Sequence, residues 1–230
     1  MFCDFKECTE CCCVHKPALF SELNKEEKEF LFAQRREVTY KPGEVIFKQG
    51  ASMTHIGCNK DGIVKMVAEA PNGMNILLRL ISPGELFGGM GLYIDETNQT
   101  STVALTQVKV CLIPVDSFKT ILEKNHKVAL ELIKRINNHA VNSKNKTLEL
   151  TTQSMYGRVS SLLLYLSKSI YNSNEFESNL SRQDMADLSA MAKESLIRVF
   201  KELKDSNIIT IDRNFIKIID ENKLIRFTLN

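Results

Sequence analysis

Long apolar runs are missing from this chain of 230 residues, and its net charge is small. Apolar stretches such as SSLLLYL at 160–166 fall far short of the roughly 20 residues that cross a bilayer, so we expect no membrane-spanning segment and no membrane partner. Met1 is followed by Phe, Cys, Asp and further charged residues rather than by a basic stretch and an apolar core, which predicts a cytoplasmic protein without a secretory signal. The formal charge of +2 neither requires nor excludes a nucleic-acid partner.

Glycine and proline are nearly absent from the second half of the chain. Nine of the ten glycines lie between Gly43 and Gly91, and all five prolines lie at or before Pro114. In the first half, turn signals such as KPGE and APNG separate short apolar segments at 45–47, 62–67, 75–81, 102–105 and 109–114. This alternation is typical of antiparallel strands. The sequence therefore predicts an α+β protein, with an antiparallel β-roll or sandwich over residues 20–124 and a mainly helical remainder.

A long helix is predicted after this β-rich region, from about His126 to Leu150, preceded by a short helix near Asp116–Lys124. Apolar and small side chains recur along the long helix at steps of three and four, at Ile133, Ile136, Ala140, Ser143 and Thr147. Such a stripe suits a helix that pairs with a second copy of the chain. It suits equally well a helix that packs on its own β-rich domain, and the periodicity leaves both interpretations open.

The last 50 residues carry the signals of a winged helix-turn-helix. Ser181 and Asp184 have the spacing of a capping box, which predicts a helix from there to near Ala190. A second helix is predicted over 193–205, with Leu196, Val199, Phe200 and Leu203 on one face and mainly charged residues on the other. The segment 207–220 then reads as strand, turn and strand. Because residues 151–230 hold 11 basic against 10 acidic side chains, charge alone would not identify a DNA-binding unit.

The order of these parts resembles the Crp/Fnr family of bacterial transcription regulators. The resemblance is carried by the segments KPGEVIFKQG (41–50), KDGIVKM (60–66), ISPGELFG (81–88), VCLIPVDSF (110–118), MYGRVSSLLLYLS (155–167) and 180–209. It implies four parts: a Cys-rich N-terminal segment (1–19), a cyclic-nucleotide-binding-like β-roll sensor domain (20–124), a dimerisation helix (125–152) and a winged helix-turn-helix DNA-binding domain (153–230). It also implies a homodimer that binds near-palindromic double-stranded DNA, with its two reading helices in successive major grooves, and that contacts RNA polymerase.

The resemblance assigns DNA contacts by position. The residues that fall where the family reads base edges are Lys193, Glu194, Ser195 and Arg198. Their chemistry agrees, because an arginine can donate two hydrogen bonds to guanine and a glutamate can accept one from cytosine. The resemblance assigns phosphate contacts to Arg182 and Gln183, and Lys201 is expected to add nonspecific affinity.

Two alanines depart from the family pattern. Ala190 stands where the family usually has a turn glycine, and Ala192 stands where a capping Ser or Thr is common. A side chain disfavours the left-handed backbone of such a turn, and alanine cannot cap a helix. We therefore expect a strained turn or a missing cap ahead of the reading helix.

Arginine is absent between Arg79 and Arg135, and this absence bears on the ligand of the β-roll. Family members that bind cyclic AMP hold its phosphate with an Arg–Ser or Arg–Thr pair, and Gln99–Thr100 stands in its place here. Gly89 likewise replaces the glutamate that binds the ribose. Glutamine can donate a hydrogen bond to a phosphate but cannot neutralise it, so we do not expect cyclic AMP to bind in the family's usual mode.

Five of the seven cysteines lie in the first thirteen residues. In a reducing cytoplasm this spacing favours ligands or thiols over structural disulfides. The Fnr branch of the family holds a [4Fe–4S] cluster with a similar layout, which would assign as ligands Cys3, Cys8, Cys11 and Cys111, with Cys12 or Cys13 as substitutes. Zinc binding, thiol oxidation and a reduced tail without any ligand remain alternatives, so the cofactor is left unassigned.

Two other classes of function compete with a DNA-binding regulator. A cyclic-nucleotide-type regulatory module of an enzyme or channel would share the β-roll, but the missing arginine and the attached winged helix oppose it. An enzyme that uses the N-terminal thiols would need an accompanying base or cofactor motif, and His55, His126 and His139 match no triad or ligand spacing. We therefore expect a regulator without enzymatic activity, which responds to a redox or gas signal or to a small effector.

Overall fold

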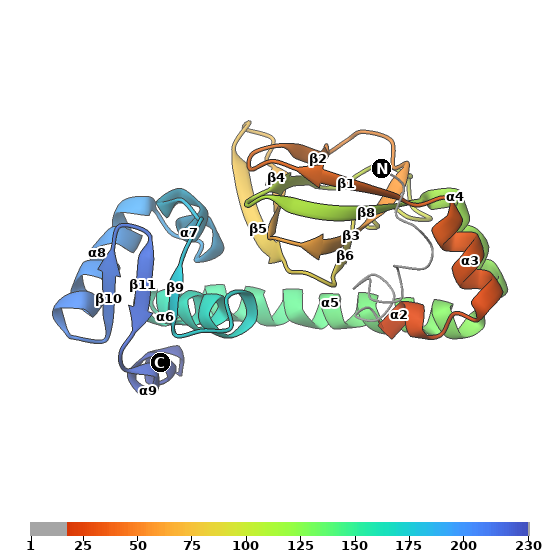
Figure 1. Ribbon diagram of the computed structural model, residues 1–230. Helices are drawn as coiled ribbons and strands as arrows, with labels where there is room; N and C mark the ends of the chain where they lie inside the picture. The colour runs from red at the N-terminus through yellow and green to blue at the C-terminus, as the bar shows by residue number, and fades with distance from the viewer. Residues whose placement is uncertain (1–17, 230) are drawn as a thin grey trace. The chain divides into compact units, whose positions relative to one another are not determined.

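The structure is a computed structural model that describes residues 18–229, and it divides the chain into two compact units, Met1–His139 and Ala140–Asn230. The division falls inside one long helix (Figure 1). The described elements of the first unit are α2 (Ala18–Ser21), α3 (Lys25–Ala33), β1 (Arg36–Tyr40), β2 (Val45–Phe47), β3 (His55–Asp61), β4 (Val64–Glu69), β5 (Asn75–Ile81), β6 (Leu86–Phe87), β7 (Ser101–Ala104), β8 (Val108–Pro114), α4 (Val115–Lys124) and the start of α5 (His126–Thr152).

The strands of the first unit form two four-stranded antiparallel sheets, ordered β1-β8-β3-β6 and β2-β7-β4-β5. The prediction of an antiparallel β-roll is confirmed. Two of the predicted strands, 45–47 and 75–81, have the observed bounds, and the other three are displaced by one or two residues. The prediction missed three strands. β1 is mostly polar, β6 has only two residues, and β3 places Gly57 and Asn59 in its interior.

Gly57 explains why β3 was hard to recognise. A Cβ atom at this position would lie 2.5 Å from Cζ of Phe87, so glycine is needed for the ring of the neighbouring strand β6 to pack against β3. Glycine in a strand interior is unfavourable by itself and often marks such a close approach. Packing across the sheet, rather than local propensity, therefore defines this strand.

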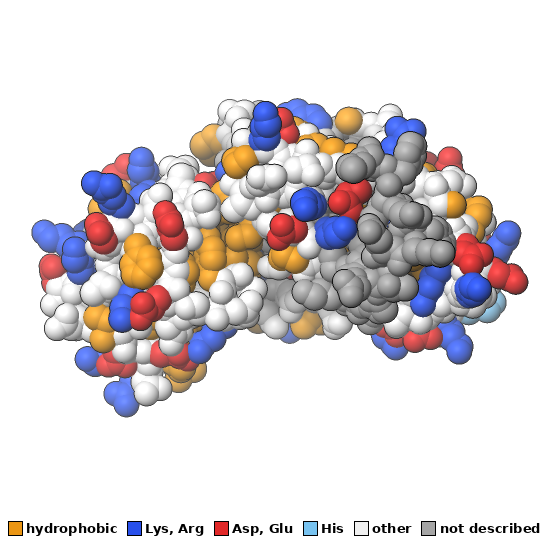
Figure 2. Space-filling view, viewed as in Figure 1, with side chains coloured by type: hydrophobic (Ala, Val, Ile, Leu, Met, Phe, Trp, Pro, Cys, Tyr) orange, Lys and Arg blue, Asp and Glu red, His pale blue; other side chains and the backbone are white. Residues whose placement is uncertain are grey.

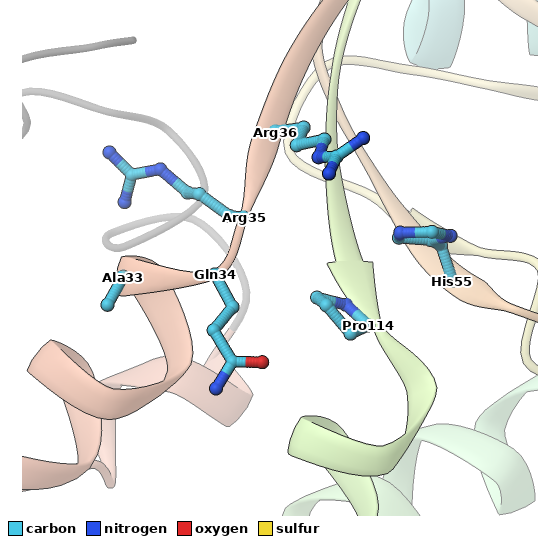
Figure 3. Close-up of a pocket in the computed structure, with 6 residues that line it drawn as sticks. All are labelled: Ala33, Gln34, Arg35, Arg36, His55 and Pro114. Carbon is cyan, nitrogen blue, oxygen red and sulfur yellow. The ribbon is translucent and has the colours of Figure 1, made fainter.

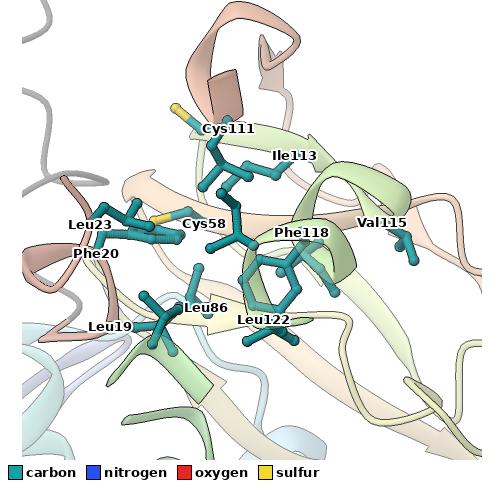
Figure 4. Close-up of a cluster of buried hydrophobic side chains, with 14 of the residues drawn as sticks. Leu19, Phe20, Leu23, Cys58, Leu86, Cys111, Ile113, Val115, Phe118 and Leu122 are labelled. Atoms are coloured by element: carbon teal, nitrogen blue, oxygen red, sulfur yellow. The ribbon is translucent and has the colours of Figure 1, made fainter. Parts of the chain in front are cut away.

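An apolar core lies between the sheet β1-β8-β3-β6 and helices α2, α3 and α4 (Figure 4). Cys58 on β3 and Cys111 on β8 are paired directly in the antiparallel register, and both side chains are wholly buried in this core. Phe20, directly after the Cys-rich segment, packs in the same cluster. The predicted ligands Cys3, Cys8 and Cys11, with their substitutes Cys12 and Cys13, lie outside the described residues.

The long helix α5 matches its predicted range and is largely exposed. Val128 is its buried side chain, and all five residues of the predicted stripe are exposed, with Ile133 at 52% and Ile136 at 57% of their full exposure. The guanidinium of Arg135 donates a hydrogen bond of 3.0 Å to the carbonyl of Leu86, which joins the helix to β6. Within the first unit, the β-rich domain thus leaves Ile133 and Ile136 uncovered, which favours the interpretation that a second copy covers them.

The second unit contains the end of α5 and a small helical domain with a three-stranded sheet, ordered β10-β11-β9. Its elements are α6 (Met155–Tyr165), the π-helical turn η2 (Leu166–Ile170), β9 (Glu175–Glu177), α7 (Arg182–Leu188), α8 (Lys193–Asp205), β10 (Ile209–Asp212), β11 (Phe215–Ile218) and α9 (Glu221–Thr228). The predicted winged helix-turn-helix is confirmed as an architecture, and the second predicted helix has the observed bounds. β9 and α9 were not predicted. None of the described helices is both long and apolar enough to span a membrane.

Candidate nucleic-acid interface

Helix α8 is held in place by one apolar face. Its buried side chains are Leu196, Val199, Phe200 and Leu203, which are the four residues that the sequence predicts for this face. Of the residues predicted to read bases, Lys193, Glu194 and Arg198 are exposed and Ser195 is half-buried. Glu194 and Arg198 lie four residues apart, so they occupy neighbouring positions on the exposed side of the helix. The arrangement presents a carboxylate acceptor and a guanidinium donor together at the N-terminal half of α8.

Helix α7 begins with the predicted capping box. The Ser181 hydroxyl accepts a hydrogen bond of 3.0 Å from the backbone N–H of Asp184, and the Asp184 carboxylate accepts one of the same length from the backbone N–H of Ser181. Met185, Ala186 and Leu188 bury the other side of this short helix. The capping box therefore fixes where α7 starts, and the buried side chains fix how it packs beside α8.

The turn between the two helices is strained, as the sequence predicts. Ala190 has a φ of +47°, in the left-handed region that glycine adopts without steric cost. Ala192 is the N-cap residue of α8 and provides no side-chain hydrogen bond to the helix. The unusual backbone at Ala190 is held by Arg158 on α6, whose guanidinium donates to the carbonyl oxygens of Ala190 at 2.7 Å and Ser189 at 3.4 Å. Arg158 thus links the turn to α6.

Arg158 is a positioning residue that the sequence reasoning did not single out. Its segment was noted only as part of the family resemblance, because nothing in the spacing of α6 shows that this arginine reaches a turn 32 residues away. Its Nε atom is buried and has no hydrogen-bond partner among the described residues. A cationic side chain at the end of α7 also interacts favourably with the exposed carbonyls of a helix C-terminus.

Arg182 makes intramolecular contacts where a phosphate contact was predicted. Its guanidinium donates a hydrogen bond of 2.7 Å to the carbonyl of Arg213 in the turn of the wing and lies over the ring of Phe200, 5.4 Å from its centroid. Burial lowers the pKa of this guanidinium from its usual value. Arg182 therefore connects α7 to the wing, and its contact with phosphate stays a prediction.

The other predicted phosphate contacts lie on exposed surface. Gln183 donates a hydrogen bond of 2.8 Å from its amide to the carboxylate of Asp187. Lys201 and Lys204, together with Arg182, line a depression of about 220 Å³ between α7, α8 and β10. Elsewhere on the face of the second unit seen in Figure 2, basic and acidic side chains are interspersed. The local grouping of cations at α8, rather than an overall positive surface, is the feature suited to phosphate.

In the first unit, Gln99, which the family resemblance predicts to stand at the cyclic-nucleotide phosphate site, takes part in an intramolecular interaction. The Gln99 amide donates hydrogen bonds to both carboxylate oxygens of Asp95, at 2.7 and 2.9 Å, and to the hydroxyl of Thr97 at 3.1 Å. The main cause that lowers the pKa of Asp95 is a hydrogen bond from the backbone N–H of Thr97, and the bonds from Gln99 lower it further. The Asp95 carboxylate is therefore ionised at neutral pH. A negative charge therefore stands beside the place where a phosphate would need a positive one.

Two family models match most of the chain between them. Residues 37–125 match the cyclic nucleotide-binding domain, and residues 157–227 match the Crp-like helix-turn-helix domain. Among curated proteins, the anaerobic regulatory protein of Haemophilus influenzae is 22% identical over 223 residues, which cover 94% of this chain and 86% of that protein. The CRP-like cAMP-activated global transcriptional regulator of Mycobacterium tuberculosis is 20% identical over 200 residues, which cover 85% and 89%.

A solved structure shows the same fold. A transcriptional regulator of the Crp/Fnr family from Eubacterium rectale superposes with a TM-score of 0.77 at 18% identity, covering 93% of this chain and 98% of that chain. The chain is a member of the Crp/Fnr family of transcription regulators. The resemblance first recognised in the sequence is thereby confirmed, and the winged helix-turn-helix of this regulator is its DNA-binding unit.

The strained turn of this Crp/Fnr regulator gives a test of stability. Replacing Ala190 by glycine removes the steric cost of the left-handed backbone, and we expect the free energy of unfolding of the second unit to rise by roughly 1 kcal/mol. Urea unfolding followed by circular dichroism measures this change. The matched control is Ala186→Gly on the helical backbone of α7, which should lower stability. A loss of stability in Ala190→Gly, like that of the control, would contradict the strain.

Proposed function

We propose that this chain acts as a homodimeric regulator that binds a near-palindromic double-stranded DNA site through α8. The observation that carries the proposal is the division of α8 into a buried apolar face and an exposed face with Glu194 and Arg198, on a turn fixed by Arg158. In the major groove, Arg198 donates to guanine and Glu194 accepts from cytosine, with Lys193 and Ser195 beside them. Arg182, Gln183 and Lys201 set the register through the phosphates.

The second copy is proposed to pair along α5. Its exposed stripe joins two large apolar side chains, Ile133 and Ile136, to the small side chains of Ala140, Ser143 and Thr147. Large apolar residues lose contact with water when two such helices pair, and small residues allow the helices to approach closely. Pairing along one axis would place the two α8 helices on successive half-sites of the DNA. RNA polymerase is the further partner proposed for the bound dimer.

The signal proposed for this regulator is a redox or gas signal, or a small effector, rather than cyclic AMP. The bonds between Gln99 and Asp95 oppose a phosphate in the β-roll. A [4Fe–4S] cluster needs thiolate ligands and would supply sensitivity to oxygen. Cys111 is a thiol of the right chemistry, with Cys58 opposite it on the same face of the sheet. The described residues contain no group of three or more potential metal ligands, so Cys3, Cys8 and Cys11 would have to complete the site.

The alternative function, a cyclic-nucleotide-type regulatory module of an enzyme or channel, has weaker support. It accounts for the β-roll but gives no role to the winged helix-turn-helix, whose reading helix is exposed and whose family model is matched over residues 157–227. Substitutions in the exposed face of α8 separate the two functions, because only a DNA-binding regulator depends on the residues of that face.

Direct reading by α8 is tested by selecting the preferred DNA from a random-sequence pool and measuring binding of variants to it. We expect Arg198→Ala to weaken binding to the selected site by about 10- to 100-fold, as for loss of a bidentate contact to guanine, and to change binding to unrelated DNA little. Lys201→Ala should weaken binding to both DNAs. It should also reduce by about one the slope of the logarithm of the binding constant against the logarithm of the salt concentration. Arg226→Ala, an exposed arginine on α9, is the control. Equal binding by Arg198→Ala and the native chain would refute the proposal.

Pairing along α5 is tested by placing a charge in the stripe. Ile136→Asp should convert the dimer to a monomer in analytical ultracentrifugation, because a carboxylate would be buried between two apolar helices. Asn138→Asp adds the same charge on the opposite, exposed side of the helix and should leave the dimer intact. Dissociation by both variants, or by neither, would show that the stripe is not the interface.

A further inference from the structure

A hollow of about 430 Å³ opens at one end of the β-roll, where strands β1 and β3 begin and β8 ends (Figure 3). Its lining residues are Ala33, Gln34, Arg35, Arg36, His55 and Pro114. The volume falls in the range of pockets that bind small molecules. The hollow lies within the first unit, and Gln99 is not among the described residues that line it.

Two of the lining residues, the cationic Arg36 and the titratable His55, lie close enough for their charges to interact. Arg36 is the first residue of β1 and His55 is the first residue of β3, and β8 lies between these strands in the sheet. Figure 3 shows both side chains on the same side of β8, near Pro114. Arg36 takes part in no ion pair among the described residues. Nδ1 of His55 lies 2.9 Å from the Thr54 hydroxyl, which leaves Nε2 for a ligand.

Among the described residues that line the hollow none is a carboxylate, and Gln34 adds a further donor. The Oε1 atom of Gln34 accepts a hydrogen bond of 2.9 Å from the Ser117 hydroxyl, so its amide N–H groups are left to donate. Arg35 is not counted, because its guanidinium points away from Arg36 and His55 and lies over the Phe32 ring, 4.9 Å from the centroid (Figure 3).

The pKa of His55 reflects the same excess of positive over negative charge around the hollow. Partial burial lowers its pKa first, and the positive charge of Arg36 lowers it further, with no acidic residue among the causes. The lowered pKa favours the uncharged imidazole at neutral pH, and its single N–H is on Nε2 in the tautomer in which Nδ1 accepts from the Thr54 hydroxyl. A ligand that brings negative charge would be attracted to the guanidinium of Arg36 and fill its hydrogen-bonding capacity.

We propose that this hollow binds a small dianion of the phosphomonoester or dicarboxylate type. The guanidinium of Arg36 forms two parallel hydrogen bonds to one acidic group. His55 and Gln34 donate to the remaining oxygens. The charge of Arg36 selects anions over neutral molecules, because a neutral ligand would leave that charge unpaired.

The position of the hollow connects it to the rest of the first unit. Gln34 is bonded to Ser117 on α4, and α4 leads directly into α5. If the regulator acts as proposed above, binding of a ligand here would affect α5, the helix proposed to form the dimer, through Gln34 and α4. The binding step itself does not rest on that function, because it can be measured without DNA.

The experiment is isothermal titration of the full chain with inorganic phosphate and, separately, with malonate. We expect saturable binding of at least one of them, weakened tenfold or more by Arg36→Gln and by His55→Gln. Arg35→Gln removes the same charge from the rim while its side chain points away, and should bind as the native chain does. Circular dichroism establishes that each variant is folded.

Three results would overturn the proposal. The first is the absence of saturation by either anion up to about 10 mM, and the second is unchanged binding by Arg36→Gln. The third is an equal loss in Arg35→Gln, which would show a general effect of charge rather than a site. A separate titration with the selected DNA distinguishes the two proposals, since anion binding without DNA binding would remove the proposed function and leave this site standing.

Discussion

The left-handed turn at Ala190 decides where the reading helix points. A residue with a side chain adopts this backbone only at a cost, so the surrounding structure has to hold it. Arg158 does so by donating to the carbonyls of the turn, and the buried face of α8 prevents the helix from rotating. The exposed positions of Glu194 and Arg198 follow from these two constraints. In the proposed mode of binding, DNA recognition therefore depends on an arginine that lies on a different helix from the residues proposed to contact the bases.

The first unit has the fold of a cyclic nucleotide-binding domain, and the family resemblance predicts Gln99 where members that bind cyclic AMP have an arginine. Gln99 is held by the carboxylate of Asp95, and the arginine that the family uses for phosphate is missing. Arg36, which makes no ion pair among the described residues, stands instead where β1 and β3 begin and β8 ends. The fold has thus been retained while its electrostatics differ, which is why family membership alone does not identify the effector.

Much of the architecture could be predicted because local signals and packing agree. Helix α8 has the predicted bounds and the predicted buried face, and the capping box at Ser181 starts α7 as expected. Prediction failed where structure depends on distant partners. β3 pairs with the distant strand β8 and carries a glycine where Phe87 packs, and β9 pairs with a strand some 40 residues later. The hydrogen bond from Arg182 to the wing and the reach of Arg158 have no local pattern for the same reason.

The central claim is that two copies of α8 enter successive major grooves of one DNA site. Hydroxyl-radical and methylation footprinting on the selected DNA tests it most directly. The account predicts two protected major-groove segments whose centres are separated by one helical turn, about 34 Å, with symmetric sequence in both. A single protected half-site, or protection confined to the minor groove, would contradict it.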